Sequence, residues 1–435
     1  MKSHFRLQPT ALAFVLLASL LMVSVALAAE VVIDTFNVAP QTVEASNPVF
    51  IADGSASDPT ILGTERDIHV QRLSGSVTRV QVGPPSNTLV FTLGPGDLGT
   101  ASVIYDGADA NPALDPDGLC SPGCVDLTGG GTNDSLHFEA VFNDKSFLVE
   151  FRVYSGSTTD YLRYQLILPG SIELNRHVDF MIPFADFTSV GNGASFANVG
   201  AFEIFLDGSD PASAGAKLTL DLFKADSWRD FGDAPAGYGT VTHRPNGLRL
   251  GANVDAEASQ LFNPNAVGDD TNQSDDEEGV LRTPGFNWST IGGGSVDVTL
   301  NGCMTTPCFL NGWVDWDKDG QFESGEQIFT DFTLNSNGSH TLTFTIPAGP
   351  AFNTSYFARF RVCTSAATCS SPTGFAGSGE VEDYLWAFGP TAIELSSFSA
   401  QSGSPQQYIL ILAIAALTLL VGASAFALVK RYQKA

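Results

Sequence analysis

Twelve residues in the C-terminal third of the chain carry acidic side chains at the spacing of a calcium-binding loop: residues 315–326 read D-x-D-x-D-G-x-F-x-x-G-E. Calcium takes six to eight hard oxygen ligands, and a loop of the EF-hand type supplies them from positions 1, 3, 5, 7, 9 and 12. Gly320 is at position 6, where the chain turns too sharply for a Cβ. We therefore predict calcium as the cofactor, and the alternative is a solvated turn of Asp and Gly. The predicted ligands are five carboxylates and the backbone carbonyl at position 7: Asp315, Asp317, Asp319, Gln321, Glu323 and Glu326.

The segments on both sides of this loop are predicted to be strands. Residues 309–314 are rich in aromatic and apolar side chains, and residues 328–334 alternate between apolar and polar ones. Both patterns are typical of strands, whereas an EF-hand loop is flanked by helices. The calcium loop is therefore expected on a β scaffold.

A second concentration of acidic residues lies between residues 269 and 278. Runs of like charge are usually solvated, so a solvated acidic loop is the preferred interpretation. The alternative is a second cation site, to which Asp230 and Asp233 would also contribute. Its main candidate ligands are Asp269, Asp270, Asp275 and Asp276, and Glu277 and Glu278 could join them.

The chain carries no recognised catalytic motif. Residues 94–99 satisfy G-x-G-x-x-G, but residues 100–105 read as a strand, where a dinucleotide site needs a helix. G-x-S-x-G, H-E-x-x-H and P-loop patterns are absent from the sequence. We therefore predict that the chain is not an enzyme. Hydrolysis of a polysaccharide by two carboxylates is kept as an alternative, because their separation is a property of the folded chain.

Composition and charge narrow the class of protein. Charged residues make up 16% of the 435 residues, and there are 43 glycines and 23 prolines, which suits extracellular β-sandwiches joined by turns. The net charge is −26, and five of the 21 basic residues lie at the two ends, which leaves 16 basic against 47 acidic residues between them. Such a surface repels nucleic acid and attracts divalent cations. Nucleic acid is therefore excluded as a partner.

Two apolar segments predict export and membrane anchoring. Residues 1–29 have the basic start, the apolar run and the small-residue cleavage site of a signal peptide. Residues 408–429 are long enough for one membrane span, and the basic tail 430–435 should stay in the cytoplasm. A linker at 389–407 would join this span to the rest. We expect an exported, single-pass membrane protein with an extracellular N-terminal bulk.

All six cysteines lie in the exported part, as three close pairs. Disulfides are the default in an oxidising compartment, and proximity favours local pairing among the fifteen possible connectivities. No histidine lies near any pair, which disfavours zinc. The predicted disulfides are Cys120–Cys124, Cys303–Cys308 and Cys363–Cys369.

Residues 30–226 are expected to form a β-sandwich, because short strand patterns alternate with turn residues. The length of this segment favours a jelly roll. Several stretches resemble a jelly-roll domain of bacterial surface proteins, related to carbohydrate-binding and galactose-binding-like modules. Among them are Leu62-Gly63-Thr64-Glu65-Arg66-Asp67 and Tyr105-Asp106-Gly107. The resemblance implies a binding or structural module that could bind a glycan through exposed aromatic residues. The expected strands include 88–93, 102–105, 136–142, 147–154, 161–168 and 201–206.

Residues 227–388 carry a second set of motifs, which include Gly312-Trp313-Val314-Asp315-Trp316, Ala358-Arg359-Phe360-Arg361 and Gly379-Glu380-Val381-Glu382-Asp383-Tyr384. In this order they resemble the GEVED domain, which implies an extracellular β-rich module of bacterial surface proteins and no catalytic role. Strand alternation places Glu380 and Glu382 on one face. There they either supply ligands near Asp315 or face solvent.

These features predict an all-β fold with two extracellular β-sandwich domains and one C-terminal transmembrane helix. The first domain is a jelly roll at 30–226, and the second is GEVED-like, at 227–388, and holds the calcium loop. The predicted function is that of a non-catalytic bacterial cell-surface protein, a structural or adhesive module stabilised by calcium. The alternative is a glycan-binding adhesin that acts through the N-terminal sandwich. Its partner would be a cell-surface glycan or an envelope protein.

Overall fold

The computed structural model describes residues 30–83, 86–170, 172–173, 176–268, 276–351 and 354–388. The predicted signal peptide, linker, membrane span and basic tail lie outside these residues. Within them, no helix combines the length and the apolar character that crossing a membrane requires.

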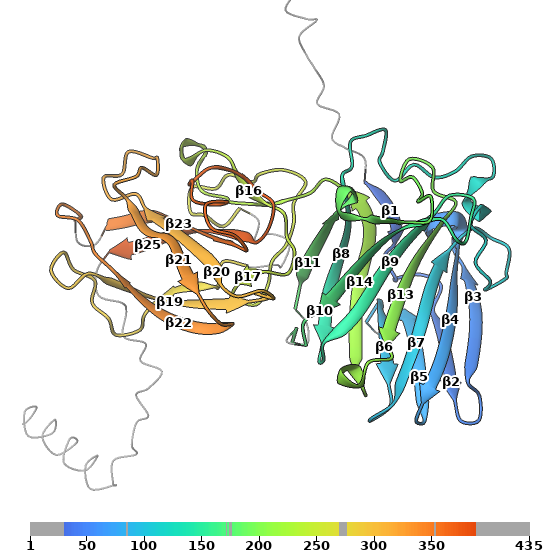
Figure 1. The fold of residues 1–435 in the computed structure, drawn as a ribbon. Coiled ribbons are helices and arrows are strands. Elements are labelled where there is room, and N and C mark those ends of the chain that lie inside the picture. The colour runs from blue at the N-terminus through green and yellow to red at the C-terminus, as the bar shows by residue number, and fades with distance from the viewer. Residues whose placement is uncertain are drawn as a thin grey trace, which may run out of the picture. The chain divides into compact units, whose positions relative to one another are not determined.

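The N-terminal half of the described chain is a sandwich of two antiparallel seven-stranded sheets (Figure 1). The first sheet runs β11 (Val178–Pro183), β8 (Ser135–Asn143), β14 (Lys217–Asp226), β6 (Thr88–Leu93), β5 (Val77–Gly83) and β2 (Gln41–Ser46), with β1 (Val31–Asp34) paired to β14. The second sheet runs β12 (Thr188–Val190), β10 (Tyr161–Leu168), β9 (Phe147–Tyr154), β13 (Ala201–Gly208), β7 (Leu98–Tyr105), β4 (Glu65–Ser74) and β3 (Ile51–Ser57). The chain repeatedly crosses between the sheets, as a jelly roll does.

Alternation along these strands builds the core of the sandwich. On β9, Phe151 and Val153 are buried in the core, so the residues between them face the other side of the sheet. At the centre, Phe138 stacks against Phe180 and Phe223 with ring centroids 5.1 and 5.3 Å apart. Three predicted strands coincide with β6, β9 and β10, and the other three are longer in the structure. The all-β prediction is confirmed over the described residues.

Residues 230–388 form a second pair of packed sheets. In one, β19 (Gly294–Asn301) pairs with β17 (Arg249–Leu250), β18 (Val280–Arg282) and β22 (Gly338–Phe344). The other runs β21 (Gln327–Leu334), β20 (Cys308–Val314), β23 (Thr354–Cys363) and β25 (Glu380–Phe388). Their shared core includes Leu300 and Phe344 from the first sheet and Leu310 and Phe360 from the second, so this part is also a sandwich.

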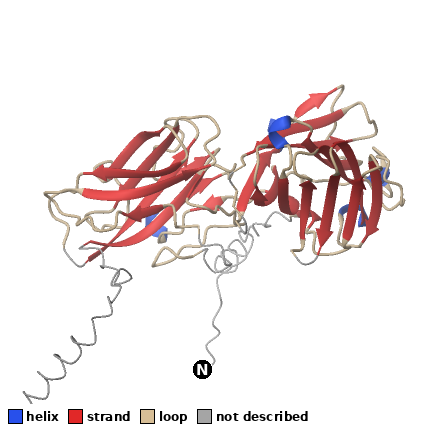
Figure 2. Cartoon of the chain, turned by 90° about the horizontal axis from the view of Figure 1, so that it is seen from below, coloured by secondary structure: helices blue, strands red, loops and turns tan. Residues whose placement is uncertain are grey.

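Smaller elements complete the described chain. A three-stranded sheet joins β15 (Asp230–Phe231), β16 (Val241–His243) and β24 (Gly374–Ala376). The helices among the described residues are short 3-10 turns, drawn in blue in Figure 2. They are η1 (Leu62–Thr64), η2 (Gly118–Cys120), η3 (Phe184–Asp186), η4 (Pro211–Ser213) and η5 (Ala236–Tyr238).

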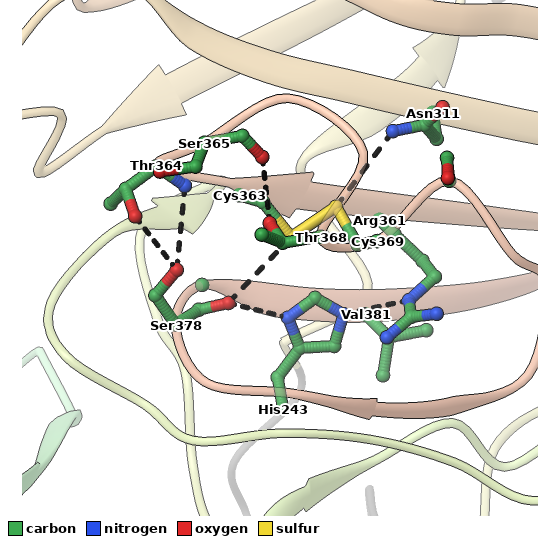
Figure 3. The surroundings of a disulfide bond; sticks show 12 residues. His243, Asn311, Arg361, Cys363, Thr364, Ser365, Thr368, Cys369, Ser378 and Val381 are labelled. Carbon is green, nitrogen blue, oxygen red and sulfur yellow. Dashed lines mark hydrogen bonds between the residues drawn. A yellow bond between two sulfur atoms is a disulfide. The ribbon is translucent and has the colours of Figure 1, made fainter.

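All three predicted disulfides are present: Cys120–Cys124, Cys303–Cys308 and Cys363–Cys369. The last of them closes the loop after β23 (Figure 3). Beside it, the hydroxyl oxygens of Thr364 and Ser378 lie 2.9 Å apart in a hydrogen bond. The end of β23 is thereby tied to the residues that precede β25.

Candidate functional site

The predicted calcium loop, residues 315–326, connects two paired strands. β20 and β21 are antiparallel, and the N–H of Val314 donates to the carbonyl of Glu326 at 3.1 Å. The N–H of Asp315 donates to the carbonyl of Phe357 on β23 at 3.0 Å. The loop therefore begins and ends on a fixed β scaffold, as its flanking patterns predicted.

The acidic side chains of the loop converge in two overlapping groups. Within each group, one carboxylate oxygen from each residue lies within 4.8 Å of the others. All five predicted acidic ligands take part, and Asp317 belongs to both groups. The groups are Asp315, Asp317 and Glu326, and Asp317, Asp319 and Glu323.

Backbone N–H groups of the loop hold the end carboxylates in position. Asp315 accepts hydrogen bonds from the N–H of Lys318 at 2.6 Å and of Gly320 at 3.1 Å. Glu326 accepts one from the N–H of Trp316 at 2.6 Å. Gly320 has a φ of +87°, a conformation that glycine adopts without steric cost. The turn at position 6 is thus the one that the sequence required.

The electrostatics of the loop favour a divalent cation. The side chains at its two ends are buried, Asp315 being 1% and Glu326 7% exposed. Burial raises the pKa of Glu326 to about 7, and the charge of Asp315 contributes. Asp319 is the main cause of the raised pKa of the exposed Glu323. A cation would neutralise this concentrated negative charge, and a set of hard oxygen donors fits calcium.

The sequence did not reveal the aromatic support of the loop. Phe322, at position 8, is buried against Tyr238, and their ring centroids lie 4.7 Å apart. The Tyr238 hydroxyl donates to Oδ2 of Asp315 at 2.6 Å. Tyr238 lies 77 residues before Asp315, so no local pattern pointed to it. Gln321, the predicted carbonyl ligand, is exposed next to Phe322.

Of the second predicted acidic cluster, the structure describes Asp276, Glu277 and Glu278, and the two glutamates are partly exposed. The side chain of Asp276 is buried, with 3% exposed, so the preferred interpretation of a solvated loop is wrong for this residue. Its predicted neighbours Asp230 and Asp233 accept backbone hydrogen bonds, from Val381 at 2.8 Å and from Gly268 at 2.5 Å. The other members lie outside the described residues: Asp269, Asp270 and Asp275.

The glutamates of the 379–384 motif are part of the interior. Glu380 and Glu382 are fully buried, so the alternative in which they face solvent is wrong. Glu380 accepts a hydrogen bond from the N–H of Leu250, and Glu382 accepts one from the N–H of Gly279 at 2.8 Å. These carboxylates accept backbone hydrogen bonds around β17 and β18.

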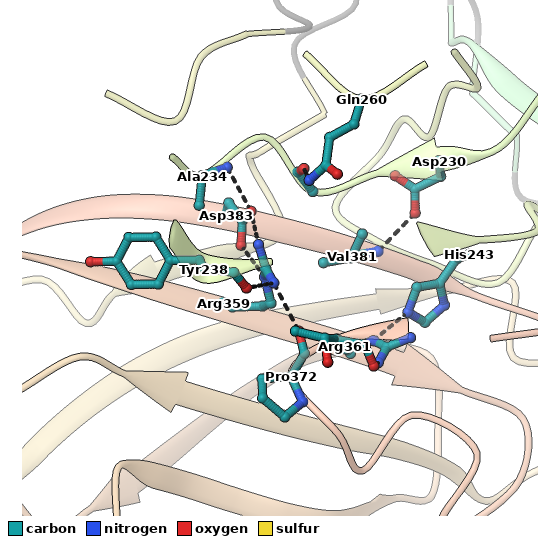
Figure 4. Close-up of polar contacts among 12 residues, drawn as sticks. Asp230, Ala234, Tyr238, His243, Gln260, Arg359, Arg361, Pro372, Val381 and Asp383 are labelled. Carbon is teal, nitrogen blue, oxygen red and sulfur yellow. Dashed lines mark hydrogen bonds and ion pairs between the residues drawn. The ribbon is translucent and has the colours of Figure 1, made fainter. Parts of the chain in front are cut away.

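The aspartate of the same motif belongs to a buried polar network with Arg359 and Tyr238 (Figure 4). Arg359 donates two hydrogen bonds to Asp383, both at 2.7 Å, and a third to the carbonyl of Tyr238 at 3.3 Å. Nε of Arg361 donates to Nε2 of His243 at 2.8 Å. Burial, followed by the charge of Arg361, lowers the pKa of His243, which keeps its imidazole neutral and able to accept. This network positions Tyr238 and, through its hydroxyl, the first acid of the loop.

A second candidate site is the outer face of the second sheet of the N-terminal sandwich. Core side chains of β7, β9, β10 and β13 alternate with side chains that face away from the core. Arg152, Tyr161 and Phe205 are partly exposed there. The aromatic and polar members of this outer face are Ser102, Glu150, Arg152, Tyr154, Tyr161, Gln165, Glu203 and Phe205.

Hydrogen bonds fix the polar side chains of this outer face. Glu203 accepts from the hydroxyls of Ser102 at 2.6 Å and Tyr154 at 2.7 Å, and from Arg152 at 3.2 Å. The guanidinium of Arg152 also lies 4.4 Å from the ring centroid of Phe205. Burial is the main cause of the raised pKa of Tyr154, and the negative charge of Glu203 adds to it. The hydroxyl therefore stays protonated and acts as a donor. The outer face combines aromatic rings with fixed donors and acceptors.

No curated protein matches the chain. Among solved structures, it is similar to a family 11 carbohydrate-binding module from Clostridium thermocellum, solved in complex with a β-1,3-1,4-mixed-linked tetrasaccharide. That similarity has 12% identity, covers 46% of this chain and 95% of that chain, and has a TM-score of 0.23. The family 11 module of a cellulosomal cellulase of C. thermocellum covers the same shares at 10% identity and a TM-score of 0.24. Similarity at these TM-scores decides neither the fold nor a ligand.

One protein family matches part of the sequence, over residues 309–386. The matched stretch begins in β20 and ends in β25. It therefore contains the acidic loop, the two arginines of β23 and the 379–384 motif, and it is shorter than the 227–388 region in which the motifs were found. Over this stretch the predicted resemblance is confirmed: residues 309–386 match the GEVED domain family.

Proposed function

We propose that the chain is an exported, non-catalytic cell-surface protein whose second sandwich binds calcium through residues 315–326. The observation that supports this most is the convergence of five carboxylates on one β-hairpin. Calcium would act structurally, because it would neutralise the clustered acids and fix the loop between β20 and β21. Export agrees with the three disulfides, which form in oxidising compartments. Residues 1–29 and 408–429 would direct export and anchoring.

Replacing Asp317 with alanine is expected to remove most of the calcium-dependent stabilisation. An ion that binds only the folded chain stabilises it by about 2.7 kcal/mol at a concentration 100 times its Kd. Asp317 belongs to both carboxylate groups and is exposed, so the calcium-free protein should tolerate its loss. Thermal melting of the full chain in calcium and in chelator measures the difference.

The matched control is Glu44→Ala, which removes an exposed carboxylate from β2 of the other sandwich. It should melt like the wild type in both conditions. Equal shifts of the Asp317→Ala melting temperature in calcium and in chelator would contradict a metal role for this residue. If the melting temperature of the wild type does not respond to calcium, residues 315–326 are an acidic turn that binds no ion.

A second candidate function is glycan binding by the outer face of the second sheet. The specific observation is that the partly exposed rings of Tyr161 and Phe205 lie on the same face as the fixed Arg152–Glu203 network. Binding sites for small molecules combine apolar and aromatic surface with a few fixed polar groups. The net charge of −26 disfavours anionic ligands. Neutral polysaccharides are therefore the expected class.

Replacing Tyr161 with alanine is expected to weaken polysaccharide binding at least tenfold, or about 1.4 kcal/mol, because its partly exposed ring is lost. Tyr161→Phe keeps the ring and should retain most of the affinity. Affinity electrophoresis of the full chain through a panel of neutral polysaccharides makes the comparison. If no member of the panel retards the wild type, the outer face does not bind this class. The Asp317→Ala variant should bind normally, which separates the two candidate functions.

A further inference from the structure

Carboxylates from two neighbouring strands meet at one end of the second sheet of the first sandwich. Glu65 and Asp67 lie two residues apart on β4 and so share a face. Asp106 and Asp109 follow β7, the antiparallel partner of β4. One oxygen from each of Glu65, Asp67 and Asp109 lies within 4.8 Å of the other two. This group is outside both candidate sites described above.

The loop after β7 is folded around these side chains. Oε1 of Glu65 accepts a hydrogen bond from the N–H of Ala110 at 2.7 Å. Oδ2 of Asp106 accepts one from the N–H of Asp115, also at 2.7 Å. The first bond ties the loop to β4, and the second closes the loop on itself. Asp109 directly precedes Ala110, whose N–H is bonded to Glu65 on β4. The backbone at Asp109 is therefore held beside β4.

Asp67 is the feature that points to a ligand. Its side chain is 1% exposed, yet neither carboxylate oxygen accepts a hydrogen bond from a described residue. Asp106 is 2% exposed, and its Oδ1 is also without a donor among the described residues. Buried polar atoms without partners cost free energy, and like charges close together add to the cost. No described lysine, arginine or histidine forms an ion pair with Asp67, Asp106 or Asp109.

Two kinds of partner could satisfy these oxygens, a cation or a proton held between Asp67 and Asp106. Burial raises the pKa of Asp67 to about 6, and the charges of Glu65 and Asp109 contribute to the rise. The nearby hydroxyl of Ser55 opposes it, although it makes no hydrogen bond of normal geometry to Asp67. Burial likewise raises the pKa of Asp106 to about 7. A divalent cation would neutralise two charges of the group at once, whereas a shared proton would neutralise one. The donors are all hard oxygens, which calcium prefers, and the group offers no nitrogen or sulfur for zinc.

We propose that Glu65, Asp67 and Asp109, with Asp106 beside them, form a calcium site that ties the loop after β7 to β4. The ion would lie between β4 and the loop after β7, which are about 40 residues apart in the sequence. There it would bind the carboxylate oxygens of Asp67, which accept no hydrogen bond from the described residues. The site shares no residue with the 315–326 loop. Either site can therefore exist without the other.

Equilibrium dialysis of the full chain against calcium tests the site by counting bound ions. Asp67→Asn is expected to bind one ion fewer than the wild type, and it keeps the size of the side chain. Asp317→Ala should lose an ion only if the 315–326 loop binds one, so failure of this site and failure of that loop give different results. Glu44→Gln, an exposed carboxylate of the same sandwich, should bind as many ions as the wild type.

Thermal melting checks that the Asp67→Asn variant is folded. Because the substitution removes a buried charge, the variant should melt in chelator at or above the wild-type temperature. In calcium it should gain less stability than the wild type. An ion count equal to that of the wild type overturns the site and leaves the shared proton as the explanation. A loss of stability of equal size in chelator and in calcium overturns it as well.

Discussion

Replacing Arg359 with methionine is expected to destabilise the second sandwich by about 3–5 kcal/mol, the cost of removing one partner of a buried ion pair. The side chains of Arg359 and Asp383 are both 0% exposed, and two hydrogen bonds of 2.7 Å join them. Methionine fills much of the arginine's volume but carries no charge. Asp383 would keep the N–H of Ala234 at 2.8 Å as a donor, while its negative charge would stay buried and uncompensated.

Urea unfolding of the full chain measures this loss. The matched control is the double variant Arg359→Met/Asp383→Leu, because removing both charges of a buried pair is often neutral or stabilising. It should recover most of the lost free energy of unfolding. A single variant within about 1 kcal/mol of the wild type, the usual effect of a point mutation, would show that the pair contributes little to stability.

The same substitution is expected to weaken calcium binding to the 315–326 loop. Arg359 donates to the carbonyl of Tyr238, and the Tyr238 hydroxyl donates to Asp315. The 379–384 motif therefore acts on the loop through Asp383 and its bonds to Arg359, whereas Glu380 and Glu382 accept backbone hydrogen bonds elsewhere. The double variant removes the same guanidinium, so it should regain stability without regaining calcium affinity.

Much of the fold could be predicted because its signals are local. Alternation with a period of two marked strands such as β9 and β10 to the residue. The disulfides join cysteines four to six residues apart, so proximity was enough to pair them. The loop at 315–326 carries all of its acids within twelve residues, and the structure brings those side chains together.

The features that could not be predicted depend on residues that are far apart in the sequence. Glu380 accepts a hydrogen bond from Leu250, 130 residues away, and nothing near either residue indicates the other. Acidic side chains are rarely buried without a partner, so the sequence offered only solvent or a cation site near Asp315 as surroundings for Glu380 and Glu382. The group at Glu65 and Asp67 was missed because its third member, Asp109, lies beyond the next three strands, β5, β6 and β7.

His137 predicts a pH dependence of stability for the first sandwich. It is 1% exposed on β8, with Nδ1 2.8 Å from Oδ2 of Asp226 on β14 and Nε2 3.1 Å from Oδ2 of Asp179 on β11. Burial lowers the pKa of the imidazole, but the two aspartates outweigh burial and raise it to about 9. Lys224 also contacts Asp226, at 3.1 Å. The folded protein therefore holds the imidazole proton more tightly than the unfolded chain does.

Because the folded pKa lies above the ordinary value of 6.5, protonation of His137 stabilises the fold by about 3 kcal/mol. This contribution is fully present below pH 6.5 and is lost as the pH rises through about 9. His137→Gln does not titrate, so its deficit in free energy of unfolding should be large near pH 6 and should shrink by about that amount by pH 9.5. Urea unfolding in saturating calcium measures both proteins across this range. A deficit that does not change with pH would mean that His137 is neutral in the folded state, and Lys224 would then have to be the charge that balances Asp226.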